Sequence, residues 1–260
     1  MKEVFKYTFL TTAEIKKFAL LVIIASILTI IQAFPVISIV SFLVEKMLYL
    51  SVGALLIFLV QNSTEETYFT LLKKQPLSTF LLHFLPTAMG ILTALFVITS
   101  LFTAFFIMIL KFTNSVFILA NPHEFMFALS KTPFVTKVLI GFYSVYMIFY
   151  SYIFLGKFAE ALSKEGFKDA FLSMLSSIID FKFWIRSFNL KYMVIYFVWS
   201  FIILAIYSVT AVTYLFYIFP LILTHPNLGL LMIPLLVAIV TILSYFTFFS
   251  AYFAYKTTKD

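Results

Sequence analysis

The sequence predicts an all-α, polytopic integral membrane protein with six transmembrane helices and additional interfacial amphipathic helices. The composition is the first reason, because 63% of the 260 residues are hydrophobic and only 11% are charged, whereas soluble domains are about 45–50% apolar and about 25% charged. The second reason is that six apolar runs approach or exceed the ~20 residues that a helix needs to cross ~30 Å of hydrocarbon. The third is that no run alternates polar and apolar residues as a membrane-barrel strand does.

The six predicted spans follow one another in a single membrane domain, residues 1–260. Residues 1–12 are aromatic and basic and suit the membrane interface, and Thr11 and Glu14 have capping-box spacing at the start of the first span. No small-residue cleavage site follows the first run, so we expect a retained helix and not a signal peptide. The spans cover about 14–34, 36–61, 87–111, 134–156, 192–219 and 228–255.

The positive charges predict the orientation. The net charge is +7, and in a membrane protein the positive-inside rule explains this excess without nucleic acid. With the N-terminus inside, 14 of the 18 basic residues are cytoplasmic: Lys2, Lys6, Lys16, Lys17, Lys73, Lys74, Lys157, Lys164, Lys168, Lys182, Arg186, Lys191, Lys256 and Lys259. Lys111, Lys131 and Lys137 lie on the other side, and Lys46 remains. We therefore expect a prokaryotic inner (plasma) membrane protein with both termini in the cytoplasm.

Glu45 and Lys46 interrupt the second apolar run, and two interpretations fit them. In the first, the chain turns at Pro35 and both charges lie near mid-membrane, where each costs roughly 2.5–3.5 kcal/mol unless it is paired. Ser41 and Tyr49, one helical turn away, could then interact with Glu45 and reduce the cost of burying its charge. In the second, Pro35 only kinks a longer first span, and the two charges mark its outer end. Span lengths favour the turn at Pro35. A buried pair would be a candidate functional site, whereas the alternative is that Lys46 merely snorkels to the interface.

Two further segments are amphipathic, and both are predicted to be cytoplasmic. In residues 157–188, apolar residues recur at spacings of three and four, with polar residues between them, which predicts a helix lying in the interface. Its candidate contact residues are Phe167, Phe171, Met174, Ile178, Trp184 and Arg186. In residues 64–85, Thr64 to Lys74 predicts a short helix with acidic residues at its start and lysines at its end, as the helix dipole favours, and Pro76 ends it.

The sequence carries little chemistry. It has no cysteine, which excludes disulfides, thiolate metal sites and thiol nucleophiles. It contains no nucleotide-binding glycine loop and no GxSxG or HExxH motif. His123, Glu124 and His225 are the only weak candidate for a metal site, and their neighbouring prolines are ordinary turn chemistry. The fourth span is crowded with tyrosines, which we interpret as packing residues and not as the lining of a quinone or lipid groove: Tyr143, Tyr146, Tyr150 and Tyr152. We therefore expect no catalytic residue, no metal, no cofactor and no enzymatic activity.

Residues from about 155 to 260 resemble the C-terminal half of a family of uncharacterised archaeal and bacterial integral membrane proteins. The residues that carry the resemblance are "FAEALSKEGFKDAF", the amphipathic segment after it, and the final hairpin ending "YFTFFSAYFAY". This resemblance implies a multi-span helical protein and transfers no catalytic residue.

A second, shorter stretch, "EETYFTLLKKQPLSTFLLHFL", is similar to the cytoplasmic segment of ABC-2-type exporter permeases, where it forms a coupling helix against an ATPase subunit. The matching residues are Glu65, Thr67, Leu71, Leu72, Pro76, Leu77 and Ser78. The spacing departs from the family pattern, because three residues separate Leu72 from Pro76 instead of two.

These observations predict a non-enzymatic membrane protein that serves as an accessory, scaffold or assembly subunit. Its expected partners are the lipid bilayer and other membrane-protein subunits or further copies of itself, and no nucleic acid. The alternative prediction is the permease subunit of an ATP-driven exporter, which would need a separate cytoplasmic ATPase.

Overall fold

The computed structural model describes residues 1–115, 131–218, 220, 224 and 226–259, and all regular secondary structure in these residues is helical. The predicted all-α fold class is therefore confirmed. His123, Glu124 and His225 lie outside the described residues, so the metal-site candidate that they form is not tested by the structure.

Five helices of the described residues are long and apolar enough to cross a membrane: Ser38–Asn62 (α3), Leu81–Phe112 within α5 (Leu77–Phe112), Phe134–Leu162 (α7), Leu190–Thr213 (α10) and Met232–Lys256 within α12 (Pro226–Lys256). These helices place the chain among membrane proteins. The first predicted span corresponds to α2 (Ile15–Ile31), which has 17 residues. At 1.5 Å per residue it is about 26 Å long, at the short limit for a crossing.

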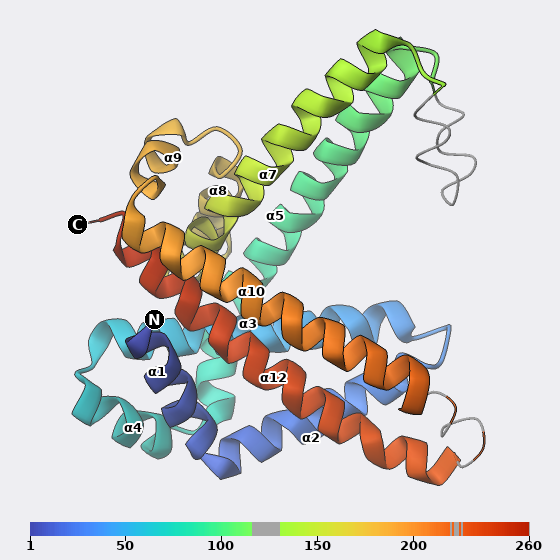
Figure 1. Cartoon of the computed structure of the whole chain (residues 1–260). Coiled ribbons are helices and arrows are strands. Elements are labelled where there is room, and N and C mark those ends of the chain that lie inside the picture. Colours follow the sequence, from blue (N-terminus) through green and yellow to red (C-terminus); the bar gives the residue numbers. More distant parts are fainter. Residues whose placement is uncertain (116–130, 219, 221–223, 225, 260) are drawn as a thin grey trace.

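The long helices form three hairpins that extend from a shared end of the molecule (Figure 1). Helices α2 and α3 make the first hairpin, α5 and α7 the second, and α10 and α12 the third. The α5–α7 hairpin leaves the body at a steep angle to the other two. This shared end, which we call the basal end, holds both termini and the short helices α1 (Lys2–Ala13), α4 (Glu65–Lys74), α8 (Phe167–Ser176) and α9 (Phe181–Ser187).

The core lies where the hairpins meet, and α3 is its central helix. Most of the apolar part of α3 is buried, whereas few residues of α10 are buried and side chains such as Phe197, Phe201 and Leu204 are exposed. Leu56 and Ile57 of α3 and Phe249 of α12 are among the largest fully buried side chains. Since the exposed surfaces of α10 are apolar, they need lipid or another protein around them.

The start of the first span differs from the prediction. The capping box between Thr11 and Glu14 does not form, because Thr11 lies inside a separate helix, where its hydroxyl donates to the carbonyl of Tyr7 at 2.8 Å. Glu14 instead sits at the break between α1 and α2, with φ −77° and ψ 75°. Residues 1–13 thus fold as a separate helix, α1, which packs on α12 and α4.

The entrance of α5 also differs from the prediction, which started the third span at about residue 87. Residues 77–85 are continuous with the span, and Pro86 lies inside the helix. A proline within a helix removes one backbone hydrogen bond. Burial around it compensates, because Phe84, Ala88 and Ile91 are all buried.

The chain turns at Pro35, as the first of the two interpretations of the Glu45 region requires. Helix α2 ends at Ile31, the turn occupies residues 32–37, and α3 begins at Ser38. The carbonyl of Pro35 accepts a hydrogen bond from the Ser38 hydroxyl at 3.1 Å. Glu45 lies seven residues into α3, about 10 Å from its start, which is neither the middle of the helix nor its end.

Candidate functional site at the basal end

The most strongly built polar feature of the described residues is a buried lysine at the basal end. The side chain of Lys157 in α7 is only 2% exposed. Its ammonium group lies 2.7 Å from Oε2 of Glu160 and 2.5 Å from Oδ2 of Asp180. It also lies 4.8 Å from the centre of the Phe183 ring. A buried charge persists only when it is paired and hydrogen-bonded, and two carboxylates and an aromatic face meet that condition here.

Asp180 links this network to the next helix. Its Oδ1 accepts a hydrogen bond from the backbone N–H of Phe183 at 3.0 Å, so the carboxylate caps α9. Partial burial alone would raise the pKa of the Asp180 carboxyl. The hydrogen bonds from Lys157 and Phe183 and the positive charges of Lys157 and Arg186 outweigh that effect, and the pKa is lowered. One carboxylate therefore neutralises the buried lysine and fixes the start of α9.

Tyrosines of α7 hold α8 and α9 in place. The Tyr150 and Ser177 hydroxyls share a hydrogen bond of 2.9 Å, Tyr146 donates to the carbonyl of Ile178 at 3.2 Å, and Tyr152 donates to the carbonyl of Ser187 at 2.7 Å. The sequence predicts that these tyrosines serve packing. In the structure, two of the hydroxyls also bond to the segment that connects α8 to α9, and the third bonds to the last residue of α9.

The predicted interfacial helix is two helices, α8 and α9, and its apolar residues do not share one surface. Met174 is fully buried, whereas Phe167 is partly exposed and Ile185 strongly exposed. The cause is a close approach of α8 to α5, since a Cβ at Gly90 would lie 2.3 Å from the carbonyl oxygen of Phe167. Of the predicted contact residues, Phe171, Ile178 and Trp184 are partly buried and Arg186 is exposed.

The second layer of the basal end consists of α1 and α4. Tyr68 of α4 is fully buried, and its hydroxyl lies 2.7 Å from the Thr11 hydroxyl. Because Thr11 already donates its single proton to Tyr7, Tyr68 is the donor. Burial raises the pKa of Tyr68. An ion pair between Lys6 and Glu65 joins the same two helices on the exposed side.

The residues of the predicted coupling segment divide between buried and exposed positions. Leu72 is buried and Leu71 is partly buried, so they attach α4 to the core. Glu65, Thr67, Pro76 and Ser78 are exposed. The ammonium group of Lys17 in α2 donates to the carbonyl of Gln75 at 2.6 Å and so fixes the end of α4. The arrangement is a surface helix with a polar outer face and a rigid attachment.

The predicted intramembrane charges are held differently from expectation. Glu45 is 8% exposed, and its Oε2 accepts a hydrogen bond of 2.5 Å from the side-chain amide of Gln32. Ser41 and Tyr49, the partners that the sequence suggested, bond elsewhere: Ser41 to the carbonyl of Leu28 and Tyr49 to Thr241. The ammonium group of Lys46 is half-exposed, 3.8 Å from Oε1 of Glu45.

An apolar groove of about 400 Å³ lies between the hairpins. Helices α3, α5, α7, α10 and α12 all contribute to it, with Phe154, Trp199 and Phe248 on its walls and Lys46 at one end. The Trp199 indole N–H donates to the Thr247 hydroxyl at 3.1 Å and is therefore satisfied. The lining of the groove is predominantly apolar, with few polar groups, as in grooves that face lipid or bind hydrophobic ligands.

Within the described part of the chain, no group of three His, Asp or Glu side chains could hold a metal ion. His83 is exposed on α5, with its ring 5.0 Å from that of Phe84. Comparison with known proteins adds no family: no protein-family model, curated protein or solved structure matches the chain. The two resemblances noted in the sequence therefore stay predictions.

Sequence reasoning missed the role of Lys157, which it counted only as a cytoplasmic charge. The spacing of Lys157 and Glu160 is a local signal, because residues three apart share a helix face. Asp180 is 23 residues further along the chain, and only the fold brings it to Lys157. Its position directly before "FKFW" is that of a helix N-cap residue, which was the available signal.

Proposed function

We propose that the chain is a six-span inner-membrane protein that acts as a scaffold or assembly subunit, with both termini in the cytoplasm. The crossing that needs its own test is α2. The ion-paired and lysine-rich short helices lie at the basal end, and all three hairpins lead away from it, which supports an even number of crossings (Figure 1). The apolar composition of α2 and its direct packing on α3 and α12 support this helix as the sixth membrane crossing.

Cysteine labelling tests this topology. Val36 is 94% exposed in the turn between α2 and α3, and Lys168 is exposed on α8 at the basal end. The protein has no native cysteine, so single cysteines at these positions report without background. We expect a membrane-impermeant maleimide to label Val36→Cys and Lys168→Cys from opposite sides. Labelling of both from one side would contradict the six-span topology.

The observation that carries the scaffold role is the divergence of the α5–α7 hairpin from the rest of the molecule (Figure 1). Its outer half has only a small core of its own, formed by Ile109, Leu110 and Ile140. Beside this core lies an apolar hollow of about 550 Å³, with Phe102, Phe105, Phe142 and Tyr143 on its walls. Among the described residues, no third helix covers the outer half of this pair, and a membrane helix pair with such aromatic walls suits binding to another membrane helix.

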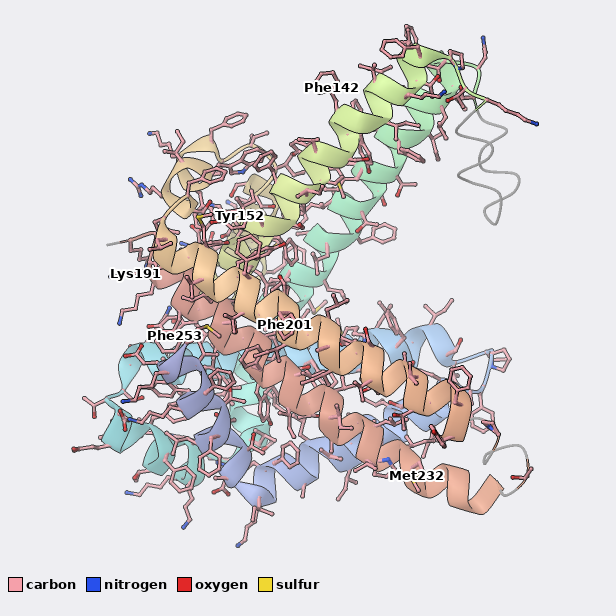
Figure 2. The ribbon with its side chains drawn as sticks, in the orientation of Figure 1. Phe142, Tyr152, Lys191, Phe201, Met232 and Phe253 are labelled. Carbon is pink, nitrogen blue, oxygen red and sulfur yellow. The ribbon has the colours of Figure 1, made fainter. Side chains whose placement is uncertain are left out.

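A photocrosslinking amino acid tests this role in native membranes. Phe142 lines the hollow and is 71% exposed, whereas Phe201 on α10 is 73% exposed and belongs to a different hairpin (Figure 2). A crosslinker at Phe142 should produce a discrete protein adduct, either a dimer of this chain or a complex with a second protein. The same group at Phe201 should react mainly with lipid. Lipid adducts alone at both positions would argue against a scaffold role.

The exporter alternative rests on α4. Its exposed polar face and its attachment through Tyr68 and Leu72 are what a helix needs to transmit a partner's movement to the spans. Thr70 is exposed on this face. If an ATPase docks here, ATP hydrolysis should copurify with the detergent-extracted protein and be lost in Thr70→Arg. If the wild-type protein is folded, with α4 in place, and no ATP hydrolysis copurifies with it, the exporter role is excluded.

A further inference from the structure

A polar pocket of about 490 Å³ opens at the basal end, apart from both short-helix layers. It lies where three long helices end: Gln61 is near the end of α3, Ser163 follows α7, and Lys256 is the last residue of α12. Lys164, Tyr252 and Lys259 complete the polar wall. Pockets of this volume hold small organic ligands or headgroups.

The charge of this pocket is positive. Three lysines line it, and no carboxylate of the described residues does. Among the described residues, the ion pairs involve Lys6, Lys46 and Lys157 and none of these three. Three helix C-termini oppose them, each equivalent to about −0.5 charge, so the three lysines outweigh the helix dipoles. Tyr255 also lines the pocket, and the carboxylate of Glu160 is already paired with Lys157 at 2.7 Å.

The loop that carries Lys164 is fixed in position. The Thr87 hydroxyl of α5 donates to the carbonyl of Lys164 at 3.0 Å and accepts from the N–H of Gly166 at 3.2 Å. Thr87 is 1% exposed. Gly166 has φ 84°, a conformation that side chains disfavour. The backbone of this wall is therefore held in place without a ligand.

The turn that carries Lys259 is fixed as well. Asn189 donates to the carbonyl of Thr257 at 3.3 Å, and the N–H of Lys259 donates to the carbonyl of Lys256 at 3.1 Å. The ammonium group of Lys259 lies 4.6 Å from the centre of the Tyr255 ring. The lysine backbones on two sides of the pocket thus stay in place while their side chains adjust to a ligand.

We propose that this pocket binds a phosphate-bearing anion through Lys164, Lys256 and Lys259. Each ammonium group offers three donors, and the Tyr252 hydroxyl and the Gln61 amide, neither of which bonds to another described side chain, offer further ones. Basic pockets between membrane helices bind lipid phosphate groups in this way. The phosphate comes either from an anionic lipid headgroup or from a soluble phosphate compound. The inference does not depend on the scaffold role, because it requires only the folded chain in a membrane.

Two probes separate the sources. Native mass spectrometry of the full chain counts bound phosphatidylglycerol against phosphatidylcholine, and calorimetric titration in neutral detergent measures inorganic phosphate. The test variant is Lys164→Gln/Lys256→Gln/Lys259→Gln. The matched control, Lys73→Gln/Lys74→Gln/Lys168→Gln, removes the same charge from exposed sites on α4 and α8.

For a lipid source we expect the wild type and the control to retain phosphatidylglycerol selectively, and inorganic phosphate not to bind. For a soluble source we expect phosphate binding without lipid selectivity. In either case the triple variant should bind about a hundredfold more weakly, since each lysine contributes about fivefold. If the melting temperature of the triple variant falls, the three single variants are tested instead, and each should bind about fivefold more weakly than the wild type. Equal loss in the triple variant and the control, or no binding of either probe by the wild type, would overturn the proposal.

Discussion

The ammonium group of Lys157 lies 2.5 Å from the carboxylate of Asp180 and joins the end of α7 to the start of α9. This contact connects a long apolar helix to the short helices of the basal end. Asp180 also accepts from the N–H of Phe183, so one side chain neutralises a buried charge and caps a helix. The attachment of α8 and α9 to the rest of the molecule therefore depends on two residues distant in sequence.

Replacement of Asp180 should destabilise the protein more than replacement of an exposed charge. In Asp180→Ala, the 2% exposed Lys157 keeps only Glu160 as a partner, and α9 loses its cap. Leaving a buried charge undercompensated costs about 2–4 kcal/mol. The free energy of unfolding in detergent, measured by denaturant titration, checks this value against the control Asp169→Ala, which lies exposed on α8. Equal losses in the two variants would show that the network does not stabilise the fold.

The same carboxylate predicts a pH dependence. Its pKa is lowered in the folded state from an ordinary value of 3.8. A carboxyl with a depressed folded pKa stabilises the protein fully above the unfolded pKa and loses that contribution as the pH falls through the folded pKa. The difference in melting temperature between the wild type and Asp180→Asn should therefore be constant from pH 7 to about 5 and shrink below pH 4. A difference that grew on acidification would have the wrong sign.

The hydrogen bond from Tyr68 to Thr11 predicts how α4 is held. Tyr68→Phe keeps the buried ring and removes only the donor, while the Thr11 hydroxyl still bonds to Tyr7. We expect a loss of about 1 kcal/mol, together with faster amide hydrogen exchange in α4 and unchanged exchange in α12. Tyr217→Phe, at an exposed position, is the control. Unchanged exchange in α4 would indicate that packing alone holds this helix.

The sequence predicts the all-α class and the positions of five long helices because lipid imposes a simple requirement: a continuous apolar run long enough to cross. It also favoured the turn at Pro35, where the structure places it. It did not predict that α1 separates from α2, since the break at Glu14 depends on α1 packing against α12 and α4. Nor did it predict the split between α8 and α9, where Tyr146 and Tyr150 of α7 bond to Ile178 and Ser177.

The candidate site was less predictable, because its contacts are long-range. Glu45 stood out as a charge in an apolar run, but its partner Gln32 is on the other side of the turn and 13 residues away. Lys157 and Asp180 looked like ordinary cytoplasmic charges until the fold placed them together. Met174 was a predicted contact residue of the interfacial helix, on the basis of periodicity. Periodicity alone cannot distinguish a lipid-facing side chain from one packed on a neighbouring helix.

The contact between Gln32 and Glu45 predicts a distinct effect of two substitutions at one position. Glu45→Ala leaves the Gln32 amide without its acceptor and should cost about 1–3 kcal/mol, with faster hydrogen exchange in the turn of residues 32–37. Glu45→Gln keeps an acceptor oxygen and should cost less. Lys111→Gln is the control, because that side chain is exposed on α5. If Glu45→Ala and Lys111→Gln unfolded at the same denaturant concentration, the Glu45 carboxylate would not be stabilising the turn.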